Sequence, residues 1–119
     1  MKLTMIFSFL LASLFSCQPK QQEEYTSLKV DDFAALIARP DVQRVDVRTV
    51  AEYSEGHIPG SVNHPLERIQ TYDGDISAPI FAYCRSGSRS ARAVALLKEL
   101  DYEAVNLGGI IDYRGELER

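Results

Sequence analysis

The strongest constraint on the fold is a continuous apolar run at residues 79–83, which a short polar loop separates from an amphipathic segment at residues 88–100. The run has the length of a strand and no polar face, as expected of a strand that is buried on both faces of a parallel sheet. In the second segment, apolar side chains recur at the spacing i, i+3, i+4, i+7, namely at Ala93, Leu96, Leu97 and Leu100. This spacing predicts a helix that packs one stripe against the sheet.

Shorter patterns on both sides of this unit predict further strands and helices. Strands are predicted at residues 42–47 and 104–107, with a short edge strand at residues 28–30. Helices are predicted at residues 33–37, 65–72 and after Gly108-Gly109. Because strands and helices alternate along the chain, the predicted class is α/β.

A capping pattern predicts one more helix after the strand at residues 42–47. Thr49 is followed three residues later by Glu52, which is the spacing of a capping box, and Gly56 stands where such a short helix would end. The segment 56–61 contains two glycines and one proline, so it is predicted to form a rigid loop.

The N-terminal residues have the layout of a secretory signal. Lys2 precedes an apolar run from Leu3 to Phe15, which is too short to span a bilayer. The run ends in Leu14-Phe15-Ser16-Cys17, which resembles the lipobox of bacterial lipoproteins, although Phe15 replaces the usual small residue. The alternative is an ordinary secretory signal with Cys17 unmodified.

The lipobox resemblance and the polar composition of residues 18–24 together predict a division of the chain into three parts. Residues 1–16 would be a signal peptide, residues 17–27 a lipidated Cys17 with a flexible tether, and residues 28–119 one folded domain. The residue after Cys17 is Gln18 rather than Asp, which by resemblance to Gram-negative lipoproteins favours the outer membrane. The expected location is therefore the periplasmic side of the cell envelope, with a lipid anchor in the membrane.

The charge of the chain argues against one class of partner. Its 119 residues include 13 Lys plus Arg and 17 Asp plus Glu, for a formal net charge of -4. There is no basic run able to neutralise several phosphates, so nucleic acid is not an expected partner.

The loop between the predicted central strand and helix carries the most specific chemistry, with the sequence Cys84-Arg85-Ser86-Gly87-Ser88-Arg89-Ser90. Backbone N–H groups of such a loop and the positive end of the following helix form a cradle for anions. A cysteine sulfur in this cradle is stabilised as the thiolate. The alternative is an inert core thiol, the common state of a buried cysteine. The neighbouring arginines, serines and glycine favour the reactive cysteine.

Three motifs of the chain together resemble the rhodanese family. The first is the Cys84–Ser90 loop, with Arg89 five positions after Cys84. The second comprises Asp46-Val47-Arg48, Glu52-Tyr53 and residues 56–61, and the third is Asn106-Leu107-Gly108-Gly109-Ile110. The resemblance extends from about Leu28 to the C-terminus, and an aromatic residue near the end is Tyr113 where the family often has tryptophan.

The rhodanese resemblance implies a fold and a set of site residues. The fold would be a five-stranded parallel sheet with helices on both faces. Cys84 would carry sulfur as a persulfide, and a surrounding cradle would bind the persulfide and the substrate, formed by Arg85, Ser86, Gly87, Ser88 and Arg89. Asp46 and Arg48 would support the site through ion pairs and hydrogen bonds, with direct contact between Arg48 and the substrate as the alternative. No metal or organic cofactor is implied. His57 and His64 have no second ligand at a zinc spacing, so they are predicted as turn and packing residues.

The implied reaction is the transfer of a sulfur atom from thiosulfate or a similar donor to cyanide or a small thiol. One rival is a cysteine-dependent phosphatase or arsenate reductase. Those phosphatases place arginine six positions after the cysteine, whereas here Ser90 occupies that position and Arg89 precedes it. The other alternative is a sulfur-relay or binding module that serves a protein partner.

Overall fold

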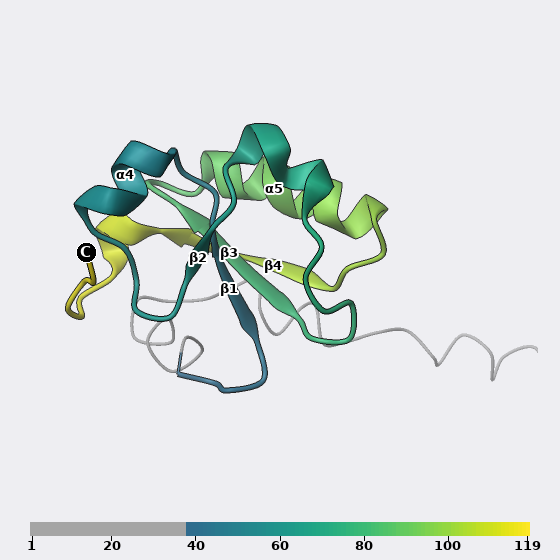
Figure 1. Ribbon diagram of the computed structural model, residues 1–119, viewed down its shortest axis with the longest axis horizontal. Helices are drawn as coiled ribbons and strands as arrows, with labels where there is room; N and C mark the ends of the chain where they lie inside the picture. Colours follow the sequence, from purple (N-terminus) through teal and green to yellow (C-terminus); the bar gives the residue numbers. More distant parts are fainter. Residues whose placement is uncertain (1–37) are drawn as a thin grey trace, which may run out of the picture.

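The computed structural model describes residues 38–119, which form one parallel sheet with helices packed against it (Figure 1). The elements in chain order are β1 (Gln43–Asp46), α4 (Val50–Glu55), β2 (Val62–Asn63), the 3-10 helix η3 (Leu66–Thr71), β3 (Ile80–Cys84), α5 (Ser88–Glu99), β4 (Ala104–Gly109) and the 3-10 helix η4 (Ile110–Asp112). The strand order is β2-β1-β3-β4, and every neighbouring pair is parallel. The α/β class is therefore confirmed.

The described residues contain four strands rather than the five that the rhodanese resemblance implied. Three predicted features lie outside these residues: the edge strand at 28–30, the helix at 33–37, and the signal, Cys17 and tether at 1–27. No helix within residues 38–119 is both long enough and apolar enough to cross a bilayer.

The central position of β3 follows from its apolar sequence. All five of its residues are buried, and β3 pairs with β1 on one side and β4 on the other. Ile80, Ala82 and Cys84 pack on one face of the sheet, while Phe81 and Tyr83 pack on the opposite face. The prediction of a doubly buried strand is confirmed, with bounds at Ile80–Cys84 rather than at residues 79–83.

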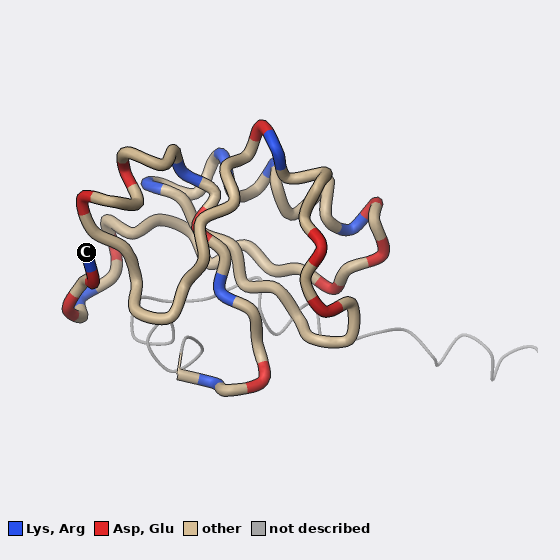
Figure 2. Tube along the Cα trace, viewed as in Figure 1, with Lys and Arg blue, Asp and Glu red and all other residues tan. Residues whose placement is uncertain are grey.

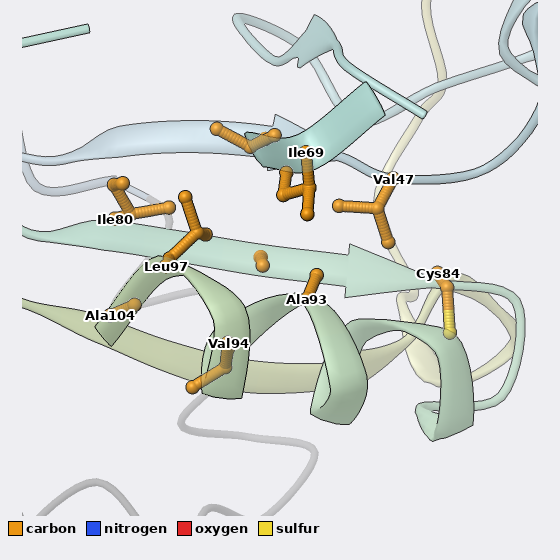
Figure 3. Packing of buried hydrophobic residues seen from close by; sticks show 10 residues of the cluster. Val47, Ile69, Ile80, Cys84, Ala93, Val94, Leu97 and Ala104 are labelled. Atoms are coloured by element: carbon orange, nitrogen blue, oxygen red, sulfur yellow. The ribbon is translucent and has the colours of Figure 1, made fainter. Parts of the chain in front are cut away.

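Helix α5 and the 3-10 helix η3 cover one face of the sheet, as Figure 3 shows from close by. Ala93 and Leu97 of α5 are fully buried, and they pack in one cluster with Ile69 of η3 and the side chains of β3. The predicted helix at 88–100 is confirmed. At residues 65–72 the chain forms a 3-10 helix with a kink at Arg68 rather than an α-helix.

Within residues 38–119, the opposite face of the sheet has a thinner cover. Phe81 and Tyr83 pack there with Ile58, and with Ile110 and Tyr113 from the C-terminal segment. The only helix that this segment adds is the single turn η4. The rhodanese resemblance implied helices on both faces of the sheet. In the described part of the chain, the helical cover of this second face is the single turn η4.

The structure confirms the predicted capping box. The Thr49 side chain accepts a hydrogen bond from the Glu52 N–H, and Glu52 Oε1 accepts one from the Thr49 N–H. Helix α4 begins directly after Thr49 and ends before Gly56, as the sequence indicated.

The C-terminal part of the sheet differs from the prediction in two ways. The sequence predicted a strand at 104–107 with a turn at the glycines, but β4 continues through Gly109. Its register with β3 is interrupted, because Ala82 pairs with Asn106 and Tyr83 pairs with Gly108, which leaves Leu107 as an additional residue. The edge strand β2 was not predicted, since two residues give no recognisable periodicity.

Charged residues of both signs are interspersed along the described chain, as Figure 2 shows. The formal net charge of the whole sequence is -4.

Candidate active site around Cys84

Cys84 is the last residue of the central strand, and its side chain points toward the first turn of α5 (Figure 3). The residue is only 1% exposed. Three donors surround Sγ: the Gly87 N–H at 3.0 Å, the Ser90 N–H at 3.4 Å and the Ser90 hydroxyl at 3.4 Å. The sulfur therefore lies inside a ring of hydrogen-bond donors at the positive end of a helix.

These donors control the ionisation of the thiol. Burial alone raises the pKa of Cys84, because a charged sulfur is less well solvated in the interior. Hydrogen bonds from the Ser90 side chain and from the backbone of Ser90, Gly87 and Ser86 act in the opposite direction and outweigh burial. The net pKa of Cys84 is lowered, as expected of a reactive rather than an inert thiol.

Two glycines allow the loop to take this shape. Gly87 is the N-cap of α5 and has a φ of 106°, a left-handed conformation that side chains disfavour. At Gly109 of β4, an added Cβ would clash with the backbone of Arg85 and Ser86, so only glycine allows the loop to rest on this strand. The loop is thus fixed between the end of β4 and the start of α5.

The remaining predicted cradle residues form the rim of the site. Arg85, Ser86 and Ser88 are exposed, while Gly87 and Arg89 are half-buried. The donors to Sγ are backbone N–H groups of the loop and the Ser90 hydroxyl, and no described hydrogen bond to Sγ comes from the side chain of Arg85, Ser86 or Ser88. Their place on the rim makes them accessible to a molecule that approaches Cys84.

The side chain of Arg89 binds helix α4. Its two terminal nitrogens donate to the two carboxylate oxygens of Glu52, at 2.8 Å and 3.0 Å. The hydrogen bonds from Arg89 are the main cause of the lowered pKa of Glu52, which is about 2. This bidentate pair joins the first turn of α5 to the capping box of α4.

Asp46 and Arg48 form a buried ion pair at the end of β1. Arg48 Nη2 lies 2.7 Å from Asp46 Oδ2, and Arg48 Nε donates to both oxygens of the same carboxylate at 3.0 Å. Nη2 also donates to the carbonyl of Gly56 at 2.7 Å. Asp46 pairs in register with Tyr83, the neighbour of Cys84, so this cluster supports the strand end that carries the cysteine.

Tyr83 attaches the loop at residues 56–61 to the sheet. Its hydroxyl accepts a hydrogen bond from the Ile58 N–H at 3.1 Å and contacts Ser61 Oγ at 2.8 Å. Burial raises the pKa of Tyr83, so the hydroxyl stays neutral. These contacts hold the predicted loop next to the central strand.

The two histidines belong to local packing contacts. His57 stacks on Tyr53 with ring centroids 3.6 Å apart, and its Nδ1 donates to the Tyr53 carbonyl at 2.9 Å. Nε2 of His64 contacts the carbonyl of Arg68 and the hydroxyl of Thr71. Within residues 38–119, His, Cys, Asp and Glu side chains form no group of three that could hold a metal ion.

Two residues of the site, Ser90 and Asn106, were not predicted from the sequence. Ser90 was part of the quoted loop, but it was not assigned to the cradle, although it supplies two of the three donors to Sγ. Asn106 Oδ1 lies 2.6 Å from Ser90 Oγ, and Asn106 Nδ2 donates to the Gly87 carbonyl at 3.1 Å. The sequence signal for Ser90 was its place in the first turn of the helix, where N–H groups lack helical partners.

Comparisons with known proteins agree with this arrangement. The family described as rhodanese-like domain matches residues 29–116. The thiosulfate sulfurtransferase PspE of Escherichia coli is 37% identical over 73 residues, which cover 57% of this chain and 70% of that protein. A sulfurtransferase of Allochromatium vinosum is 43% identical over 75 residues, which cover 60% of this chain and 70% of that protein.

A solved structure shares both the fold and part of the sequence. The crystal structure of a rhodanese-like domain protein from Staphylococcus aureus matches with a TM-score of 0.64 and 31% identity, over 75% of this chain and 92% of that chain. Sequence, strand topology and the loop after the central strand thus lead to one assignment: the chain belongs to the rhodanese-like domain family.

Proposed function

We propose that this protein is a sulfurtransferase in which Cys84 carries the transferred sulfur as a persulfide. The observation that carries the proposal is the buried Sγ with three hydrogen-bond donors and a lowered pKa. Such surroundings maintain a nucleophilic thiolate and stabilise negative charge on sulfur during transfer. Relatives that carry the name sulfurtransferase support the same reaction class.

The proposed reaction has two half reactions. In the first, the Cys84 thiolate attacks the outer sulfur of thiosulfate; a bond forms to Sγ, the original S–S bond breaks, and sulfite leaves with its electron pair. The outer sulfur of the resulting persulfide carries the negative charge. In the second, cyanide or a small thiolate attacks this outer sulfur, and the electron pair of the broken bond returns to Sγ.

The rim of the site has a separate part in this proposal. Arg85 stands exposed beside Cys84, together with the small side chains of Ser86 and Ser88. A guanidinium at the entrance attracts a doubly charged donor, and small neighbours leave space for it above the sulfur. Gly87 contributes its N–H directly to Sγ.

The direction of Arg89 favours sulfur transfer over phosphate hydrolysis. A phosphatase of the compared type needs its loop arginine to bind the oxygens of the phosphoryl group. Here both terminal nitrogens of Arg89 are already bound to Glu52. Arg89 therefore acts in our proposal as a support of the cradle, through its link between α4 and α5.

Incubation with thiosulfate tests the proposed reaction. The full chain is expected to gain one sulfur atom, located by peptide mass at Cys84, and to release it as thiocyanate when cyanide is added. Hydrolysis of aryl phosphates is expected to be negligible under the same conditions. A chain that gains no sulfur, or that turns over aryl phosphates efficiently, contradicts the proposal.

We further propose that the protein is a lipoprotein on the periplasmic side of the cell envelope, anchored through Cys17, with the outer membrane favoured by Gln18. The change Cys17→Ala is expected to prevent lipid attachment, because the modified atom is the sulfur of this residue. The variant should move from the membrane fraction to the soluble fraction after a salt wash, whereas Cys84→Ser should remain with membranes. Retention of the Cys17→Ala variant on washed membranes contradicts a lipid anchor at this position.

A further inference from the structure

The hydroxyl of Ser90 lies between the reactive sulfur and the side chain of Asn106. Ser90 is fully buried, and its Oγ is 3.4 Å from Cys84 Sγ and 2.6 Å from Asn106 Oδ1. The carbonyl oxygens of Gly87 and Gly108 are also near, at 3.2 Å and 3.4 Å. A serine hydroxyl has one proton, so it can donate to only one of these acceptors at a time.

The orientation of the Asn106 amide is fixed by its other partners. Oδ1 accepts a hydrogen bond from the Gly108 N–H at 2.9 Å, and Nδ2 donates to the Gly87 carbonyl at 3.1 Å. A flipped amide would place a donor against the Gly108 N–H and an acceptor against the Gly87 carbonyl. Asn106 therefore presents its oxygen to Ser90, as an acceptor for the hydroxyl proton.

The irregular register of β4 explains why Asn106 reaches the site. The shift occurs directly after Asn106, and the Gly108 N–H turns back to bind its side chain. Bulges of this kind commonly redirect a side chain beside an active site. Asn106 pairs in register with Ala82, on the same face of the sheet as Cys84 and α5.

We propose that Ser90 is a catalytic hydrogen-bond donor whose proton turns between Asn106 and Cys84 Sγ as the charge on Sγ changes. This inference rests on the proposed persulfide mechanism and adds a residue to it. In the thiolate, Sγ is charged and attracts the proton. In the persulfide, the charge lies on the outer sulfur, Sγ is a weak acceptor, and the proton returns to Asn106.

The consequence is greatest for the second half reaction. When an acceptor attacks the outer sulfur, the S–S bond breaks and its electron pair moves onto Sγ. The Ser90 hydroxyl turns to stabilise this charge, which makes Cys84 a better leaving group. Asn106 acts as a positioning residue, because it holds the hydroxyl next to Sγ while Sγ carries no charge.

The first test measures the pKa of Cys84 from the pH dependence of its alkylation, followed on the peptide that contains Cys84. Ser90→Ala is expected to raise this pKa by about one unit, which means that the acid dissociation constant of the thiol falls about tenfold. The matched control Ser54→Ala makes the same change at an exposed position of α4 and should leave the pKa unaltered. An unchanged pKa in Ser90→Ala overturns the proposal.

A pair of variants with equal volume separates the hydroxyl from packing. Ser90→Thr keeps the hydroxyl and Ser90→Val replaces it by a methyl group, so both introduce similar crowding in this buried position. The threonine variant should have the lower pKa of the two, by about one unit. Equal pKa values in the two variants contradict the role of the hydroxyl, even if Ser90→Ala is poorly folded.

Single-turnover rates provide a readout that a structural role would not give. The rates are compared at a pH above the Cys84 pKa of both proteins, so that both thiols are ionised. Ser90→Ala should then load sulfur from thiosulfate at least as fast as the unaltered protein, because a thiolate of higher pKa is more nucleophilic. Release of the sulfur to cyanide should be slower by about three- to tenfold, because the leaving group is poorer. Equal slowing of both steps overturns the proposal.

The alkylation test requires no sulfur donor, so it remains valid if the proposed sulfur transfer itself fails.

Discussion

Replacement of Cys84 by serine is expected to abolish sulfur transfer while the fold remains intact. A serine hydroxyl does not form a persulfide, so the rate of thiocyanate formation should fall by more than about a thousandfold, to the background without protein. Serine differs from cysteine by one atom, and its oxygen can accept the hydrogen bonds that Gly87 and Ser90 donate to Sγ. Circular dichroism and thermal unfolding of the variant should therefore resemble those of the unaltered protein.

The other cysteine of the chain supplies the matched control for this change. Cys17→Ala changes a cysteine that is 67 positions before Cys84 and should retain sulfur transfer in a soluble assay. If Cys84→Ser retains sulfur transfer and Cys17→Ala loses it, the proposed assignment of the reaction to Cys84 is wrong. Loss in both variants would point to a role for the membrane anchor in catalysis.

The sequence predicted the central part of this site because its signals are local. The apolar strand, the loop that begins at Cys84 and the amphipathic helix follow one another directly, so their order places the cysteine at a helix N-terminus. The capping box of Thr49 and Glu52 was predictable for the same reason, since its two hydrogen bonds join residues three positions apart.

The features that the sequence did not predict depend on contacts between distant segments. Glu52 forms a capping box, but that motif does not indicate that its carboxylate also binds Arg89, which is 37 residues away. Asn106 reaches Ser90 only because the register of β4 shifts against β3. Strand register is determined by the packing of the whole sheet, so a short motif in one strand does not reveal it.

Removal of the buried carboxylate of Asp46 is expected to cause a large loss of stability. In Asp46→Ala, the guanidinium of Arg48 loses its partner and retains only the described hydrogen bond to the Gly56 carbonyl. An uncompensated buried charge of this kind typically costs about 3–5 kcal/mol. A domain is stable by only about 5–15 kcal/mol in total, so urea unfolding should shift to much lower denaturant concentrations.

The chain contains a matched control for this experiment in the exposed pair of Arg39 and Asp41. Asp41 and Arg39 have the same two-residue separation as Asp46 and Arg48, and the closest N–O distance is 2.7 Å in both pairs. The difference is exposure, since the side chain of Asp41 is 58% exposed and that of Asp46 is 0% exposed. Water solvates an exposed charge that loses its partner, so Asp41→Ala should leave the unfolding midpoint nearly unchanged. If the two variants unfold at the same urea concentration, burial does not make the Asp46–Arg48 pair more important for stability than the exposed pair, and the prediction is wrong.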